Sequence, residues 1–190
     1  GRLDEAEASC KQALVLKPDY AEAHYNLGIM RKELGKLEAA EASYTQAIAL
    51  QANFADAHCN LGILLKELGR LEEAEASYGR AIVLKPDFAE AHSNLGITLQ
   101  ELGRFDESEA SCRQAIVLKP DYAEAYYNLG ITLSELGRLV ETEASYTQAI
   151  ALKPNFAEAH INLGLTLLGL GRLEESETSF TLAIALKPDF

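Results

Sequence analysis

Five asparagines return at intervals of 34 residues: Asn26, Asn60, Asn94, Asn128 and Asn162. Asparagine is a mediocre helix former, so helix propensity does not explain its regular place inside helical patterns. A side-chain amide carries donors and an acceptor together, and it can bond both the C=O and the N–H of an extended backbone. The asparagines therefore predict a ladder along which an extended chain binds. An alternative, compatible with the first, is that each asparagine bonds a neighbouring repeat and orders the stack.

Other positions of the same period flank this asparagine ladder. An apolar stripe, either core or an exposed track, lies three residues further on: Ile29, Ile63, Ile97, Ile131 and Leu165. Two variable positions would select the bound sequence: Tyr25, Cys59, Ser93, Tyr127 and Ile161, and Lys32, Lys66, Gln100, Ser134 and Leu168. Acidic residues such as Glu22, Asp56 and Glu90 favour a neutral or basic partner.

A repeated scaffold must position the asparagines of the ladder, and the 34-residue period gives the length of its repeating unit. Five copies follow without insertion or deletion: 21–54, 55–88, 89–122, 123–156 and 157–190. Residues 1–20 align with the second half of this unit, so the chain begins in mid-repeat, as expected of a piece of a longer protein. Each copy has two apolar patterns of helical spacing around a Gly-centred break such as Leu34-Gly35-Lys36. The sequence predicts an all-α array of helical hairpins over residues 1–190.

Small residues predict how closely these helices approach one another. A glycine stands in the middle of each first helix, although it costs about 1 kcal/mol there relative to alanine. These glycines are Gly28, Gly62, Gly96, Gly130 and Gly164. We expect each of them to allow a close contact with the second helix of its hairpin.

Histidines and cysteines are not arranged for metal binding or catalysis. The four histidines occupy a bulky packing place and stand at least one repeat apart, too far to share an ion with ligands at about 2 Å: His24, His58, His92 and His160. Cys10 and Cys112 replace a core aromatic and are predicted to be buried, whereas Cys59, at a variable position beside the asparagine ladder, is predicted to face the binding surface. No nucleophile has a nearby base and no Gly-rich phosphate loop is present. We therefore expect the protein to have no catalytic activity and to bind no metal or cofactor.

The charge, hydropathy and cysteine content of the chain argue against several other classes of protein. Seventeen Lys and Arg against twenty-nine Asp and Glu give a net charge of −12, which disfavours nucleic-acid binding. No apolar run reaches the roughly 20 residues that span a bilayer, and no secretory leader opens the chain. Three cysteines do not make a disulfide framework. A soluble protein of the reducing cytoplasm, with no membrane partner, is expected.

The recurring residues resemble the tetratricopeptide repeat family over the whole chain. That family places a bulky residue and Leu-Gly in the first helix, then Ala, aromatic and Ala, and the matching residues here are His24, Leu27, Gly28, Ala40, Tyr44 and Ala47. The resemblance implies a right-handed α-solenoid superhelix of antiparallel helical hairpins, whose first helices line a concave groove that binds proteins. The asparagine ladder is similar to that of the superhelical repeat domain of O-linked N-acetylglucosamine transferases.

Two other functions stay open. The array could be a substrate-presenting or spacer arm of a larger enzyme such as a glycosyltransferase. It could also be a self-associating structural array, because apolar residues in the last repeat predict end-to-end contacts or a weak dimer: Leu167, Leu168, Leu170 and Ile184.

Overall fold

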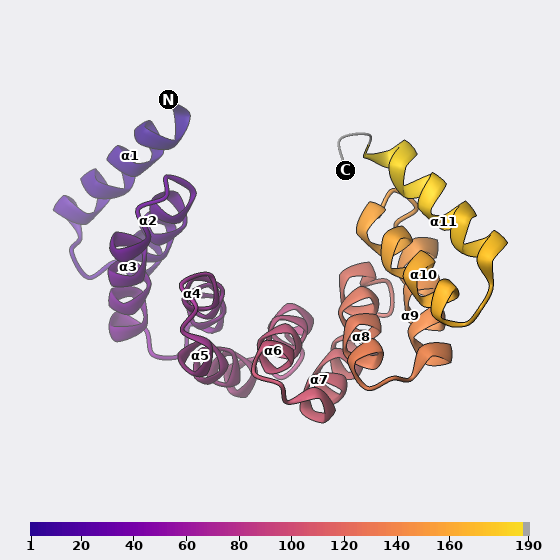
Figure 1. Ribbon diagram of the computed structural model, residues 1–190. Helices are drawn as coiled ribbons and strands as arrows, with labels where there is room; N and C mark the ends of the chain where they lie inside the picture. Colours follow the sequence, from indigo (N-terminus) through magenta and orange to yellow (C-terminus); the bar gives the residue numbers. More distant parts are fainter. Residues whose placement is uncertain (188–190) are drawn as a thin grey trace. The chain divides into compact units, whose positions relative to one another are not determined.

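The computed structural model describes residues 1–187, which form eleven α-helices joined by short turns (Figure 1). The helices are α1 (Arg2–Leu16), α2 (Ala21–Glu33), α3 (Leu37–Leu50), α4 (Ala55–Glu67), α5 (Leu71–Leu84), α6 (Ala89–Glu101), α7 (Phe105–Leu118), α8 (Ala123–Glu135), α9 (Leu139–Leu152), α10 (Ala157–Gly169) and α11 (Leu173–Leu186). The all-α class and the helical repeats are confirmed. The last three positions of the predicted repeat 157–190 lie outside the described residues.

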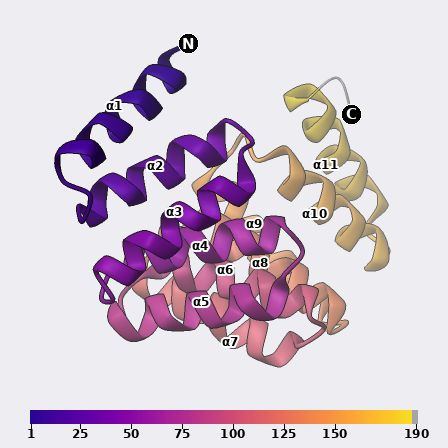
Figure 2. The same ribbon diagram turned by 90° about the vertical axis from the view of Figure 1, so that its left-hand side faces the viewer.

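Even-numbered helices are the first helices of the repeats and odd-numbered helices are the second. The chain divides within α6 into two compact units, Gly1–Ala91 and His92–Phe190. In the first unit α2 packs on α3 and α4 on α5; in the second, α8 packs on α9 and α10 on α11. Figures 1 and 2 show α1 beside α2 and α2 beside α3 from two directions. Within each unit, helices contact mainly their neighbours in sequence, as in a repeat array.

The turn inside each hairpin is closed by a glycine. Gly35 has φ 71°, in the left-handed region that a residue with a Cβ rarely adopts. The N–H of Lys36 donates to the C=O of Arg31 at 2.8 Å, and the N–H of Gly35 donates to that of Lys32 at 2.9 Å. This is the Schellman arrangement, which satisfies the last carbonyls of the helix. The Gly-centred breaks in the sequence therefore end the first helices as expected.

The mid-helix glycines also do what their position predicted. A Cβ placed on Gly28 would lie 2.5 Å from Tyr44 Cε1, and one on Gly130 would lie 2.5 Å from Tyr146 Cε1. Both tyrosines are buried on the second helix of the same hairpin. The close approach of first and second helix therefore depends on the missing side chain.

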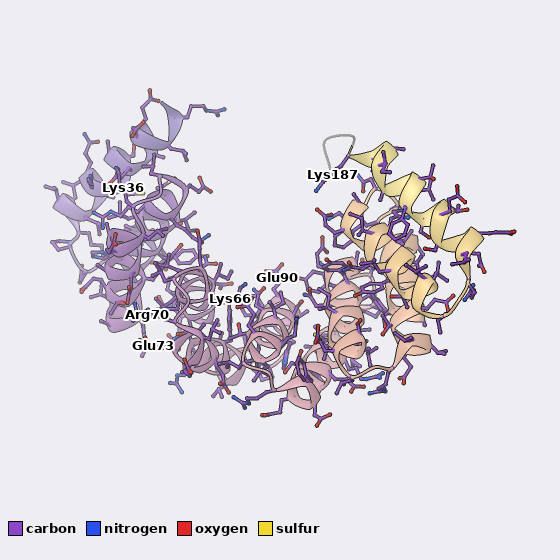
Figure 3. All side chains as sticks on the ribbon, in the orientation of Figure 1. Lys36, Lys66, Arg70, Glu73, Glu90 and Lys187 are labelled. Atoms are coloured by element: carbon purple, nitrogen blue, oxygen red, sulfur yellow. The ribbon has the colours of Figure 1, made fainter. Side chains whose placement is uncertain are left out.

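Salt bridges connect the hairpin turns to the preceding repeat. Arg70 donates to Glu73 of its own repeat at 2.6 Å and to Glu41 of the repeat before at 2.8 Å (Figure 3). The same pattern returns at Arg138 and Arg172. Exposed ion pairs contribute only about 0–1 kcal/mol each to the free energy of unfolding. These pairs link each hairpin turn to the second helix of the repeat before it. From the sequence, the glutamates of the second helices are explained by the helix dipole and a solvated face; the inter-repeat bonds emerge only in the structure.

A buried carboxylate joins α1 to the first full hairpin. Glu7 is 6% exposed, and its carboxylate lies 2.8 Å from Lys11 Nζ and 2.6 Å from Lys36 Nζ. Arg31 Nε lies 3.5 Å from the same carboxylate, and its Nη1 donates to Ser43 Oγ at 2.7 Å. Arg31 stands where the other full repeats have leucine, so this polar cluster is specific to the N-terminal end.

We expect the attachment of α1 to depend on pH. Hydrogen bonds from Lys11 and then Lys36 lower the pKa of Glu7 from 4.5 to about 2. Because the folded form binds the proton less readily, the stabilisation is complete above pH 4.5 and is lost as the pH falls through about 2. Hydrogen-exchange protection of α1 should fall across this window relative to a Glu7→Gln variant, whose α1 should be less protected already at pH 6. An identical pH response in both proteins would assign the effect to other carboxylates.

Candidate functional site

The asparagines of the ladder bond the preceding repeat. Asn60 Nδ2 donates to Tyr25 Oη at 2.8 Å, Asn128 Nδ2 to Ser93 Oγ at 3.0 Å, and Asn162 Nδ2 to Tyr127 Oη at 3.2 Å. Each bond joins two first helices and engages one of the two N–H groups of the amide. The alternative role of ordering the stack is therefore realised at these three positions.

Exposure differs along the ladder. Asn26, in the first full repeat, is exposed, and Asn60, Asn94 and Asn162 are half-buried. Asn128 is 7% exposed and is the most enclosed of the five. Asn26 and the half-buried members can therefore meet a ligand more easily than Asn128.

Tyr25 and Tyr127 are held by aromatic packing. The Tyr25 ring centroid lies 4.8 Å from that of Phe54 and 6.1 Å from that of Tyr44. Tyr127 repeats this arrangement with the ring of Phe156 at 4.7 Å. Burial raises the pKa of both hydroxyls, so each stays protonated. Each of these two tyrosines therefore packs against aromatic rings of its own repeat and accepts a hydrogen bond from the next repeat.

The apolar stripe is neither wholly core nor wholly surface. Ile29 packs against the core cluster of Ala40, Tyr44 and Leu64, whereas Leu165 is 55% exposed. Ile63, Ile97 and Ile131 are half-buried. The stripe closes the core from one side and leaves part of each side chain open beside the ladder.

A cleft of about 240 Å³ lies between α8 and α10 in the second unit. Four of the predicted groove positions line it, namely Ile131, Ser134, Asn162 and Leu165, together with the acidic Glu135. Leu139, Tyr146 and Thr166 complete the lining. Members of the ladder, the stripe and the variable positions are thus brought together on one surface.

Charged side chains of the first helices are partly neutralised in each unit. Lys32 Nζ lies 2.9 Å from Glu67 of the next first helix, and Lys66 is half-buried. In the second unit Lys153 bonds Glu124 at 2.8 Å and Lys187 bonds Glu158. These hydrogen bonds lower the pKa of both glutamates. In the first unit Glu22, Asp56 and Glu90 are exposed, so the acidic character expected from the sequence is concentrated there.

The prediction that Cys59 faces an open groove is wrong. Cys59 stands at the same repeat position as the half-buried Tyr25 and Tyr127, but its shorter side chain does not extend beyond the packed helices and is 3% exposed. Cys112 is buried as expected, and burial raises the pKa of its thiol to about 12. Cys10 is only half-buried rather than fully enclosed.

Two of the four histidines contact a carbonyl of the loop before their helix. His24 Nε2 lies 3.0 Å from the C=O of Pro18, and His160 Nε2 lies 3.1 Å from that of Pro154. Burial lowers the pKa of His58 at the same place of its repeat. No cluster of His, Cys, Asp or Glu within residues 1–187 has the arrangement of a metal site.

These features are those of a helical repeat solenoid, and family comparison identifies its class. Models described as TPR repeat match residues 1–33, 30–69 and 64–103, and models described as tetratricopeptide repeat match residues 87–155 and 145–178. The chain belongs to the tetratricopeptide repeat family. No curated protein sequence matches it.

Solved structures share the fold at low sequence identity. PilF of Pseudomonas aeruginosa has a TM-score of 0.88 at 18% identity, covering 100% of this chain and 86% of its own. MamA has a TM-score of 0.77 at 25% identity, with coverage of 85% and 95%. YrrB, described as a TPR protein with an unusual peptide-binding site, has a TM-score of 0.76 at 22% identity, with coverage of 97% and 95%. Within residues 1–187, no helix has the length and apolar character of a membrane span.

Proposed function

We propose that this chain is a non-enzymatic interaction scaffold that binds an extended, neutral or basic polypeptide segment along its first helices. The cleft between α8 and α10 is the main support, because ladder, stripe and variable positions line it together. YrrB, whose solved structure shares this fold, is described as having an unusual peptide-binding site, and this supports a peptide as the ligand. The first-helix surface offers amide groups for a backbone and apolar side chains for the residues between.

The ladder has a spacing suited to an extended backbone. Packed helices lie about 8–10 Å apart, and an extended chain rises about 3.3 Å per residue. Each asparagine could therefore address about every third residue of the ligand. In Asn60 and Asn162 the bond to the preceding tyrosine fixes the amide and leaves its second N–H and its carbonyl outside that bond. The inter-repeat bond thereby orients the same amide that would bind the ligand.

Two matched double variants separate binding from stacking. Asn60→Ala with Asn162→Ala removes both amides, whereas Tyr25→Phe with Tyr127→Phe removes the same two inter-repeat bonds and keeps the amides. We expect the asparagine variant to weaken binding of unstructured 15-residue peptides at least about tenfold, since each lost hydrogen bond contributes about 0.5–1.5 kcal/mol. The tyrosine variant keeps the amides and removes only the bonds that orient them, so we expect it to weaken binding by about threefold, less than the asparagine variant does.

Peptides selected on the wild-type protein serve as probes, and circular dichroism confirms that each variant is folded. Equal losses of affinity in the two folded variants would show that the ladder only orders the stack. If the wild-type protein bound none of the 15-residue peptides tested, the proposal would be wrong.

A further inference from the structure

Loops that lead into the first helices place an ammonium group over an aromatic ring. Lys85 Nζ lies 4.4 Å from the ring centroid of Phe88, and Lys153 Nζ lies 4.6 Å from that of Phe156. Lys17 with Tyr20 and Lys119 with Tyr122 show the same contact at 5.1 and 4.8 Å. The negative face of an aromatic ring attracts a cation at these distances. The ring of the loop is therefore a recurrent ammonium acceptor in this chain.

A carboxylate completes the ammonium site. Lys153 Nζ, already over the Phe156 ring, donates to Glu124 Oε1 at 2.8 Å. Glu124 is the second residue of α8 and belongs to the same repeat as the loop. Lys187, labelled in Figure 3, bonds Glu158 of α10 in the same way. The ammonium group of Lys153 is thus held by two groups, the Glu124 carboxylate and the Phe156 ring.

One loop has the carboxylate and the aromatic ring of this ammonium site but no lysine between them. In the repeat 21–54, Glu22 and Phe54 correspond to Glu124 and Phe156, but Gln51 stands at the place of Lys153. Glu22 is exposed and takes part in no ion pair among residues 1–187, and no lysine of that range lies over the Phe54 ring. Asp56, at the start of the next first helix, is also exposed and adds negative charge.

The backbone of this loop matches that of the lysine-containing loop. Gln51 has φ −138° and ψ 85°, and Lys153 has −137° and 83°. Phe54 has −86° and 83°, and Phe156 has −84° and 82°. The tyrosine ring that packs on each phenylalanine lies at 4.8 and 4.7 Å. Ring and carboxylate are therefore presented in the same way in the two repeats, and the lysine is the difference.

We propose that Glu22 and Phe54 bind the ammonium group of a lysine side chain supplied by a partner. The bound lysine takes the place that Lys153 occupies between Glu124 and Phe156. Where the partner is the extended segment of the proposed function, this site fixes one basic residue of that segment beside the N-terminus of α2. The inference rests on the proposed function only for the identity of the partner, because the ammonium site itself is local.

The probe is N-acetyl-lysine N-methylamide, with the norleucine analogue as the uncharged control. Binding is followed by NMR shifts of the Phe54 ring and the Glu22 side chain at constant ionic strength. In the wild type and in Gln51→Met we expect shifts that grow with the concentration of the lysine probe and exceed those caused by the norleucine analogue, as for a weak exposed contact. Gln51→Lys should abolish this excess, because the chain's own ammonium then occupies the site. Lys153→Gln should produce a second response at Phe156.

The same variants are then tested with 15-residue peptides that carry either one lysine or one norleucine. We expect Gln51→Lys to weaken the lysine peptide about two- to fivefold, as for an exposed cation–π contact, and to leave the norleucine peptide unchanged. An unaltered Phe54 response in Gln51→Lys, or an equal response to norleucine, overturns the inference.

The two proposals fail separately. A lysine-probe response at Phe54 without any peptide binding along the ladder supports the ammonium site and contradicts the proposed function. Peptides that bind the wild type and Gln51→Lys equally support the proposed function and contradict the ammonium site.

Discussion

Replacing Gly62 by alanine is expected to lower the free energy of unfolding by up to about 2 kcal/mol, although alanine is the better helix former. A Cβ on Gly62 would lie 2.7 Å from Tyr78 Cε1 and 2.9 Å from its Cδ1. The Tyr78 ring is 0% exposed, so it cannot swing into solvent to make room. The cost of overpacking, about 1–3 kcal/mol, then exceeds the gain of about 1 kcal/mol in helix propensity.

Gly79→Ala is the matched control, because Gly79 lies inside the facing helix α5. Apart from its chain neighbours and the nearby backbone of its own helix, no described heavy atom is within 4 Å of its Cβ position. There only the propensity changes, and we expect stabilisation by about 1 kcal/mol. Chemical denaturation followed by circular dichroism measures both variants. If Gly62→Ala stabilised the protein as Gly79→Ala does, the close contact between α4 and α5 would not be a constraint on the fold.

Leu64→Ala is expected to destabilise the coupling between two repeats by about 2–5 kcal/mol. Leu64 is 0% exposed and forms one core cluster with Ala40 and Tyr44 of the preceding second helix. The stability of a repeat array is the sum of the stability of each repeat and of its interfaces. Weakening this interface should let α1 to α3 unfold at lower denaturant than α8 to α11, which hydrogen exchange can resolve.

Leu165→Ala provides the comparison for this second prediction. Leu165 lies on α10 and is 55% exposed, so its truncation should change the free energy of unfolding by only about 0.5 kcal/mol. A cooperative, unshifted unfolding transition in Leu64→Ala would mean that the interface between α3 and α4 is not held by this cluster.

Much of the fold could be predicted from the residues that stop or permit a helix. Gly35 ends a helix because its left-handed φ is costly for other residues, and Gly28 stands where a Cβ would meet Tyr44. Both effects act within one hairpin, so the sequence carries them at fixed spacing. The 34-residue period then extends them to every repeat.

Less of the candidate site could be predicted, because its polar groups find partners in another repeat. Asn128 bonds Ser93, whereas Asn60 bonds Tyr25, although the two asparagines stand at the same repeat position. Periodicity identified the asparagines and the apolar stripe as a set. It could not tell which atoms of that set are used between repeats, and it placed Cys59 on the wrong side of the packing.

By itself, the sequence determined the helical hairpins and the repeat family, since both follow from backbone preferences and side-chain volumes that recur every 34 residues. Only the tertiary structure decided how the charged and polar side chains pair. Arg31 joins the Glu7 cluster where other repeats have leucine, and Lys153 is held by Glu124 where Gln51 leaves Glu22 without an ion pair among the described residues. Hydrogen bonds and ion pairs require atoms within about 3 Å, and stacking one hairpin on the next is what sets those distances.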